Sequence, residues 1–336
     1  MPIDIVGVGL NATDTLIPVS SWPASGSKIE IHAASVLPGG QVASAMVACQ
    51  SWGLRSRYIG KLGQDSAAAL HTEEFRKAGV DSCLLTAAGC SSHQSFILVE
   101  DSGERTVLWK RDDRLTIRPE ELRREWITDA RALHLDGRDT AAAIAAASWA
   151  NDAGIPVIAD LDELYPGVEE LIARVDYLIV SRNIPSRLSG KSDLFEALTA
   201  VQRRFGCYLT AATLGEEGVL ASIGGAFCYR PAFQVNVVDT TGAGDIFHAG
   251  FIYGLLHSMC LGQALDFACA AAALNCTAPG ARGGVRPVSE VENLIASGFR
   301  HPAVFPSPAK NQPTACYVKL DPAIARLAKA QNARRD

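Results

Sequence analysis

One run of residues combines glycines with carboxyl and hydroxyl side chains that could carry out chemistry: Asp239-Thr240-Thr241-Gly242-Ala243-Gly244-Asp245. A helix predicted directly after the turn would leave the backbone N–H groups of Gly242, Ala243 and Gly244 free at its N-terminus, where an anion can bind. These groups are predicted to stabilise the charge on a transferred phosphoryl group. Asp245, in the first turn, could accept the proton of an attacking hydroxyl. The alternative that this run alone leaves open is an ordinary capping aspartate after a glycine turn.

The composition favours a small-molecule partner. The chain has 336 residues and is 48% hydrophobic, which predicts one large core with room for a smaller appended unit. It carries 31 Lys and Arg against 36 Asp and Glu, and the net charge of −5 provides no general attraction to nucleic acid or to an anionic membrane. No apolar stretch is long enough to span a bilayer, and no basic segment precedes an apolar one at the start. We therefore expect a soluble, cytoplasmic protein with no nucleic-acid and no membrane partner.

The nine cysteines contain no C-x-x-C pair and no zinc-like spacing with histidine. Several lie in apolar runs, where a small thiol fills space. The pattern predicts reduced, mostly buried thiols without a redox role.

The elements that must position the glycine run alternate along the chain. This alternation predicts an α/β fold with a doubly wound, mainly parallel sheet covered on both faces by helices. Asp65 is expected to cap one of these helices. The predicted strands are 3–9, 57–60, 132–135, 157–160, 178–180 and 208–214, with a strand-like 233–238 before the glycine run. The predicted helices are 42–52, 65–79, 140–152, 193–204, 246–256 and 262–276.

A second, smaller sheet is expected to cover part of this fold. Residues 28–32 alternate polar and apolar side chains, as a half-exposed strand does, and 95–99 with 105–109 read as a hairpin around a glycine turn. We expect them to pair into a lid, formed by about 11–38 and 91–113. The main domain is then 1–300. We assign no function to the extension 301–336. Prolines break this extension, and it ends in a predicted basic helix at 321–335.

The glycine run resembles the second signature of the ribokinase (PfkB) carbohydrate kinases, over roughly residues 3–298. Gly39-Gly40, opening a helix, resembles the sugar-contacting first signature of that family. Thr213-Leu214-Gly215-Glu216-Glu217-Gly218 resembles its nucleotide-binding stretch, and 276–281 its late nucleotide and cation loop. The resemblance implies a ribokinase-like fold with a small β-sheet lid, and phosphoryl transfer from ATP, with Mg²⁺, to a sugar hydroxyl. It also implies Asp245 as the base.

The resemblance also implies the remaining site residues. The substrate would contact Asp14, Gly39, Gly40, Gln41 and Ser44. Lys28 and Arg138 are ordinary solvated charges by default, and they would join the substrate contacts if the lid closes over the sugar site. ATP would contact Asn183, Thr213, Gly215, Gly218 and Asn275. As in many relatives, Asp239 and Thr241 of this chain would offer oxygens to a monovalent cation such as K⁺. Arg111 is expected in a solvated turn, with a position that reaches into the cleft as the alternative, and His248 is expected as a packing residue. Family lids often pair between subunits, which implies a homodimer through the lid.

Two departures bear on the substrate. Ser44 stands where the family has an asparagine, and Ser186 stands where it has the glutamate of its N-x-x-E motif. Residues 8–14, 133–138 and 180–182 resemble ketohexokinases and bacterial sulfofructose kinases, which favours a ketose. Lys28 and Arg138 together would suit an anionic ketose, with a phosphate or sulfonate. Two alternatives stay open, a ribose or nucleoside kinase on the same fold and a catalytically silent sugar- or nucleotide-binding regulator.

Overall fold

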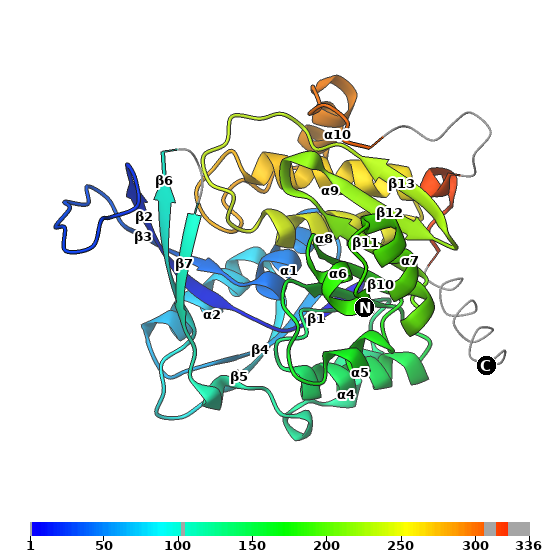
Figure 1. Ribbon diagram of the computed structural model, residues 1–336. Helices are drawn as coiled ribbons and strands as arrows, with labels where there is room; N and C mark the ends of the chain where they lie inside the picture. The colour runs from blue at the N-terminus through cyan, green and yellow to red at the C-terminus, as the bar shows by residue number, and fades with distance from the viewer. Residues whose placement is uncertain (1, 102–104, 306–313, 322–336) are drawn as a thin grey trace.

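The computed structural model describes residues 2–101, 105–305 and 314–321, and a nine-stranded sheet forms its centre (Figure 1). The strands from β11 to β5 pair in parallel, and two antiparallel strands extend the other edge. The predicted doubly wound fold is confirmed. From edge to edge the strands are β13 Ala226–Arg230, β12 Val219–Ile223, β11 Leu209–Thr213, β10 Tyr177–Ser181, β9 Val157–Leu161, β8 Leu133–Leu135, β1 Ile5–Val8, β4 Ser56–Leu62 and β5 Asp81–Thr86.

Helices cover both faces of this sheet because its strands are apolar on both sides. In β10, Ile179 belongs to one core, while Leu178 and Val180 belong to the other. The first core packs against α1 Gln41–Ser51, α2 Ser66–Ala78, α8 Ala243–Leu256, α9 Leu261–Asn275 and α10 Val288–Ser297. The second packs against α3 Arg124–Thr128, α4 Thr140–Asp152, α5 Val168–Ile172, α6 Ile184–Ser189 and α7 Leu194–Phe205. The helices predicted between residues 42 and 276 are present with small shifts at their ends, and Asp65 accepts the capping bond from Ala68. No helix in the described ranges has the length and apolar character needed to cross a bilayer.

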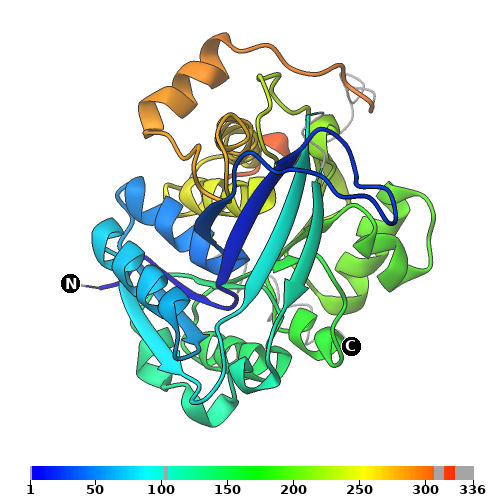
Figure 2. The same ribbon diagram turned by 90° about the vertical axis from the view of Figure 1, so that its left-hand side faces the viewer.

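The small sheet stands beside the core, and Figure 2 shows it in front of the molecule. Its strand order is β3-β2-β6-β7, from β3 Ser35–Gly39, β2 Ala12–Val19, β6 Gln94–Glu100 and β7 Arg105–Lys110. The predicted hairpin is confirmed, although most of its turn, 102–104, lies outside the described residues. We call this four-stranded sheet the lid.

Two strand predictions were wrong. Residues 28–32 form an exposed loop, and β3 pairs with β2 instead. Ile29 and Ile31 are 49% and 46% exposed, so the alternation there reflects an extended chain without a neighbouring strand. The stretch 233–238 forms only an isolated bridge at Phe233 and otherwise runs as a loop. Alternating or apolar character marks extended backbone, but a strand also needs a partner for its backbone groups.

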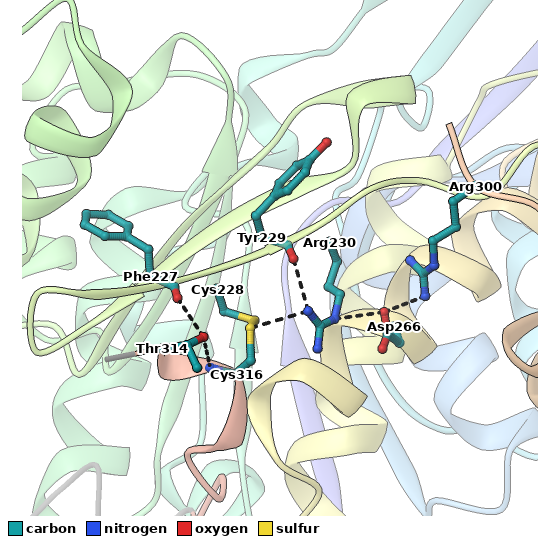
Figure 3. The surroundings of a disulfide bond; sticks show 8 residues. All are labelled: Phe227, Cys228, Tyr229, Arg230, Asp266, Arg300, Thr314 and Cys316. Atoms are coloured by element: carbon teal, nitrogen blue, oxygen red, sulfur yellow. Dashed lines mark hydrogen bonds and ion pairs between the residues drawn. A yellow bond between two sulfur atoms is a disulfide. The ribbon is translucent and has the colours of Figure 1, made fainter. Parts of the chain in front are cut away.

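The prediction that all nine cysteines are free thiols was also wrong. Cys228 of β13 and Cys316 form a disulfide (Figure 3). Further contacts hold residues 314–321 to the core: Thr314 bridges to Phe227, and Lys319 bridges to Cys260. The other seven cysteines are free and mostly buried. The helix predicted at 321–335 lies almost entirely outside the described residues.

Loss of this disulfide should destabilise the fold measurably. Its cysteines are 88 positions apart, so the bond restricts a long loop of the unfolded chain, a restriction that contributes about 4 kcal/mol in the chain-entropy model. We expect Cys316→Ser to lower the melting temperature by about 6 °C without added thiol, measured by calorimetry. Cys83→Ser, at a half-buried free thiol, is the matched control. Equal melting temperatures for the two variants under oxidising conditions would contradict this expectation.

Candidate functional site

Two cavities meet at the edge of the central sheet where its parallel strands end. The first, about 750 Å³, lies between the lid and the core, and we call it the lid cavity. The second, about 250 Å³, is mainly apolar and lies between α8, α9 and the loop after β13; we call it the apolar cavity. Thr213 and Gly244 line both. This geometry can hold two ligands whose reacting groups meet at the start of α8.

The glycine turn forms that meeting point. Gly242 has φ 73 and precedes α8, and a Cβ on it would lie 2.0 Å from the carbonyl oxygen of Ala281, so only glycine fits. Asp239 holds the turn by accepting bonds from the N–H groups of Thr241 and Gly280, each at 2.8 Å. Backbone N–H groups at a helix start, held in this way, suit an anion such as phosphate.

Asn275 supports the same turn rather than reaching a ligand. Its side-chain amide is fully buried and donates to the carbonyl oxygens of Thr241 and Ala281 at 3.1 Å. Its Oδ1 accepts from the N–H of Gly284. The structure therefore places the predicted nucleotide contact Asn275 beneath the turn.

Asp245 lies in the first turn of α8 and lines the lid cavity. Burial raises the pKa of its carboxyl to about 8, and the neighbouring carboxyl of Asp160 adds to the rise, while His248 and Arg105 oppose it. His248 was predicted to be a packing residue, but it also lines the lid cavity. Its Nδ1 lies 2.8 Å from the carbonyl oxygen of Gly244 and 3.4 Å from Oδ2 of Asp160. A carboxyl with a pKa near physiological pH can exchange a proton with a ligand.

The pH dependence of catalysis should follow this group. A base must be ionised, so kcat/KM should fall as the pH drops through about 8, the pKa of Asp245 in the free protein. Asp160→Asn removes a like charge that raises this pKa, so the midpoint of the profile should move to lower pH. The midpoint, rather than the maximal rate, is the quantity to compare. An unchanged or higher midpoint in the variant would contradict the assignment.

Asp14 and Gly40 line the same lid cavity as Asp245, and Gly39 packs against Asp14. Burial raises the pKa of Asp14 to about 6, against the opposing effects of a hydrogen bond to Ser95 and of the charge on Arg282. A Cβ on Gly39 would lie 2.0 Å from Oδ2 of Asp14, and Gly40 has φ 98. The paired glycines thus make room for the carboxylate. The structure brings the predicted residues Asp14, Gly40, Gln41 and Asp245 together around one cavity.

Of the other predicted sugar contacts Gln41, Ser44 and Lys28, only Gln41 lines the lid cavity in the described structure. Gln41 lines the lid cavity, with its amide 3.5 Å from Asp160. Ser44 lies one turn further along α1, fully buried, and its hydroxyl has no hydrogen-bond partner within the described chain. Lys28 is exposed on the 28–32 loop, and unlike Arg138 it is not among the residues that line the lid cavity or the apolar cavity in the described structure.

Arg138 does line the lid cavity. Its guanidinium lies 4.5 Å from the ring centre of Trp109 and 5.0 Å from that of Tyr165, and Nη1 donates to the Tyr165 hydroxyl at 3.0 Å. Stacking between two aromatic rings fixes a planar guanidinium well. Arg111, expected in a solvated turn, instead has a side chain that is only 11% exposed and pairs with Asp139 at 2.7 Å.

The residues predicted to contact ATP do not all line the same cavity. Thr213, Gly215 and Gly218 line the apolar cavity. Asn183 is exposed at the start of α6 and lines neither cavity in the described structure. Sequence reasoning missed several lining residues, although Asp160 and Asp162 at the end of a predicted strand were a usable signal. The missed residues are His93, Arg105, Trp109, Asp160, Asp162 and Tyr165.

Comparisons with known proteins agree with this arrangement. The chain is 29% identical over 292 residues to an ATP-dependent ribose-1-phosphate kinase of Halopiger xanaduensis, covering 83% of this chain and 94% of that protein. It is 26% identical over 301 residues to a ribokinase of Bacillus subtilis, covering 87% and 99%. The structure of an Arabidopsis thaliana ribokinase complexed with ribose and ATP matches the fold with a TM-score of 0.72, at 23% identity, over 88% of this chain and 99% of that one.

The family model described as "pfkB family carbohydrate kinase" matches residues 4–287. These residues include the central sheet, the lid and the loops that line both cavities. The chain therefore belongs to the pfkB family and is a carbohydrate kinase.

Proposed function

We propose that the protein transfers the γ-phosphoryl group of ATP to a hydroxyl of a small sugar, with Asp245 as the base and the backbone of residues 242–244 as the anion hole. The observation that carries the proposal is the position of Asp245 and the glycine turn where the two cavities meet. One cavity is apolar, as a nucleobase requires, and the other is lined by carboxylates, as a polyol requires.

ATP fits the apolar cavity with its phosphates toward α8. Thr213, Gly215 and Gly218 line the wall of that cavity, and the shared residue Gly244 leads from it to the lid cavity. The phosphates would then lie at the N-terminus of α8, where the helix dipole and the N–H groups of Gly242 and Gly244 favour negative charge; the N–H of Ala243 donates to the carbonyl oxygen of Thr240 at 3.2 Å. The name of the Halopiger relative says that it is ATP-dependent, and the Arabidopsis ribokinase structure is described as a complex with ribose and ATP. Both descriptions support ATP as the nucleotide here.

Metal ions fit in two places. No group of three or more His, Cys, Asp or Glu residues in the described ranges is arranged to hold a metal, so Mg²⁺ would be held mainly by ATP phosphates and water, with Asp160 and Asp162 within the same cavity. Mg²⁺ supplies charge neutralisation on the phosphates when bound. The buried hydroxyl of Thr241 has no partner among the described residues, and beside it lies the Asp239 carboxylate, so this pair suits a monovalent cation such as K⁺.

Transfer then needs four actions from the chain. Asp14 orients the sugar through charge-assisted bonds to hydroxyls. Asp245 takes the proton of the attacking hydroxyl, the N–H groups of the glycine turn hold the charge on the transferred group, and the lid excludes the water that would otherwise accept it. Asp245 also separates this proposal from a catalytically silent regulator, which would not need a carboxyl with a raised pKa at this position.

The sugar is proposed to be a ketose, and Arg138 favours one with an anionic group at its far end. Arg138 lines the lid cavity, is held there by the Tyr165 hydroxyl and can pair with a phosphate or sulfonate. Lys28 is not among the residues that line this cavity. A second candidate substrate is ribose or a ribose phosphate, which the names of the two relatives favour.

A homodimer through the lid is part of the proposal. Val36, Phe96 and Leu108 lie in one row across the lid, joined through Thr15, and the row faces away from the lid cavity. Their exposed fractions are 58%, 42% and 54%. An apolar sheet face of this kind in a single chain favours pairing with the same face of a second copy.

The test is a substrate panel with ATP and Mg²⁺, scored by ADP release. It contains fructose, sulfofructose, fructose phosphates, tagatose, ribose, ribose phosphates and nucleosides. We expect release with at least one sugar, and faster release with an anionic ketose than with fructose. Arg138→Ala should raise the KM of anionic sugars and leave that of neutral sugars unchanged. Release with nucleosides alone would favour the nucleoside kinase, and no release with any member would favour the silent regulator.

A further inference from the structure

One lid residue reaches the glycine run across the cleft. Arg105, the first residue of β7, donates from Nη1 to the hydroxyl oxygen of Thr240 at 2.9 Å. The two residues are 135 positions apart, and Arg105 also lines the lid cavity. A lid cation therefore lies next to the turn that is proposed to bind phosphate.

Carboxyl groups outnumber arginines among the residues that line the lid cavity. The lining residues include five carboxyl groups and two arginines: Asp14, Asp160, Asp162, Glu163, Asp245, Arg105 and Arg138. Arg138 is held by Tyr165 and Trp109. Arg105 forms no ion pair with any residue in the described ranges, and its observed partner is a neutral hydroxyl. Its charge nevertheless lowers the pKa of both Asp14 and Asp245, which places it within electrostatic reach of both.

The phosphoryl group needs such a counter-charge. Ser186 replaces the glutamate that would help organise Mg²⁺, and the described residues contain no carboxylate cluster that could hold the metal in its place. The glycine turn supplies neutral N–H donors. Among the residues that line the lid cavity, Arg105 is the cation that lies beside this turn.

We propose that Arg105 is a catalytic residue that binds the transferred phosphoryl group when the lid closes over the sugar, an inference that rests on the proposed kinase function. Its guanidinium releases the hydrogen bond to the Thr240 hydroxyl and donates to oxygens of the phosphoryl group instead. The planar, forked N–H donors of a guanidinium match phosphoryl oxygens well. The sugar oxygen forms a bond to the γ-phosphorus, the bond from that phosphorus to the β–γ bridging oxygen breaks, and the proton goes to Asp245. ADP leaves, and Arg105 makes no covalent bond. Because Arg105 belongs to the lid, closure and charge stabilisation occur together.

The kinetic test compares Arg105→Ala, Arg105→Lys and the control Lys110→Ala, which removes an exposed cation from the same strand. For Arg105→Ala we expect kcat to fall by about 10² to 10³-fold, as when one donor to a developing charge is removed. The KM for the sugar should stay within about threefold, because Arg105 contributes mainly in the transition state. Arg105→Lys should recover part of the loss, and added guanidinium ion should partly restore Arg105→Ala. Lys110→Ala should match the wild type.

A binding test separates this idea from the proposed function. We would measure the binding of a non-hydrolysable ATP analogue and of ADP by calorimetry, each in the presence of sugar. Arg105→Ala should weaken the binding of the analogue more than the binding of ADP. Equal weakening of both, or a kcat equal to that of the wild type, would overturn the role of Arg105. If the wild type phosphorylates no sugar in the panel, the proposed function fails, and the comparison of analogue with ADP still decides whether Arg105 contacts the terminal phosphoryl group.

Discussion

Asp245→Asn should lower kcat by about 10³-fold, because the amide cannot take the proton of the attacking hydroxyl. Binding of ATP and sugar should change by less than a few fold, since asparagine keeps the size and polarity of the side chain. The free energy of unfolding should also stay close to that of the wild type. The pKa of Asp245 is about 8, so the carboxyl is largely neutral at pH 7 in the free protein, and a neutral amide replaces it without loss of a charge. Steady-state kinetics together with calorimetric titration measure both parts.

The matched control is Asp113→Asn, which neutralises an exposed carboxyl outside the cavities. It should leave kcat unchanged. A loss of sugar or ATP affinity in Asp245→Asn equal to its loss in kcat would show that Asp245 binds substrate rather than serving as base.

Asp14→Asn should lower kcat/KM for the sugar by about 10²-fold, chiefly through KM. A carboxylate accepts charge-assisted bonds from two hydroxyls, while an amide offers one acceptor and replaces the other with a donor. Asp14 has a pKa of about 6, so in the wild type the sugar KM should rise as the pH falls through 6, when the carboxylate is protonated. The variant should lose this pH dependence.

The control for this variant is Asp101→Asn, an exposed lid carboxyl that lines neither cavity. A sugar KM that changes equally in both variants would point to lid charge in general. A KM of Asp14→Asn equal to that of the wild type would remove Asp14 from the sugar contacts.

Local patterns predicted the large sheet well because its strands and helices are specified by nearby residues. Apolar runs such as 157–160 and the cap at Asp65 mark their elements without reference to the rest of the chain. The lid was harder. β3 is recognised only once β2 lies beside it, whereas 28–32 has the alternation of a strand and no partner. The bond between Cys228 and Cys316 depends on two segments 88 positions apart, which spacing alone does not connect.

The same distinction applies to the site. Asp245, the glycine turn and Gly39-Gly40 lie in short motifs, and each of them is found at the junction of the cavities or along the lid cavity wall. Arg105, Trp109 and Tyr165 carry no motif; they enter the cavity because a hairpin and a loop fold over it. Asn275 lies in a recognisable stretch, but its burial beneath the turn follows from packing.

The most direct test of the central claim is a single turnover with excess protein, Mg²⁺, a sugar that releases ADP in the panel, and ATP labelled in its γ-phosphoryl group. We predict that the label is recovered on a hydroxyl of the sugar in the wild type and remains in ATP with Asp245→Asn. Label recovered as inorganic phosphate or on the protein, or transferred to the sugar at the wild-type rate by Asp245→Asn, would contradict direct transfer with Asp245 as the base.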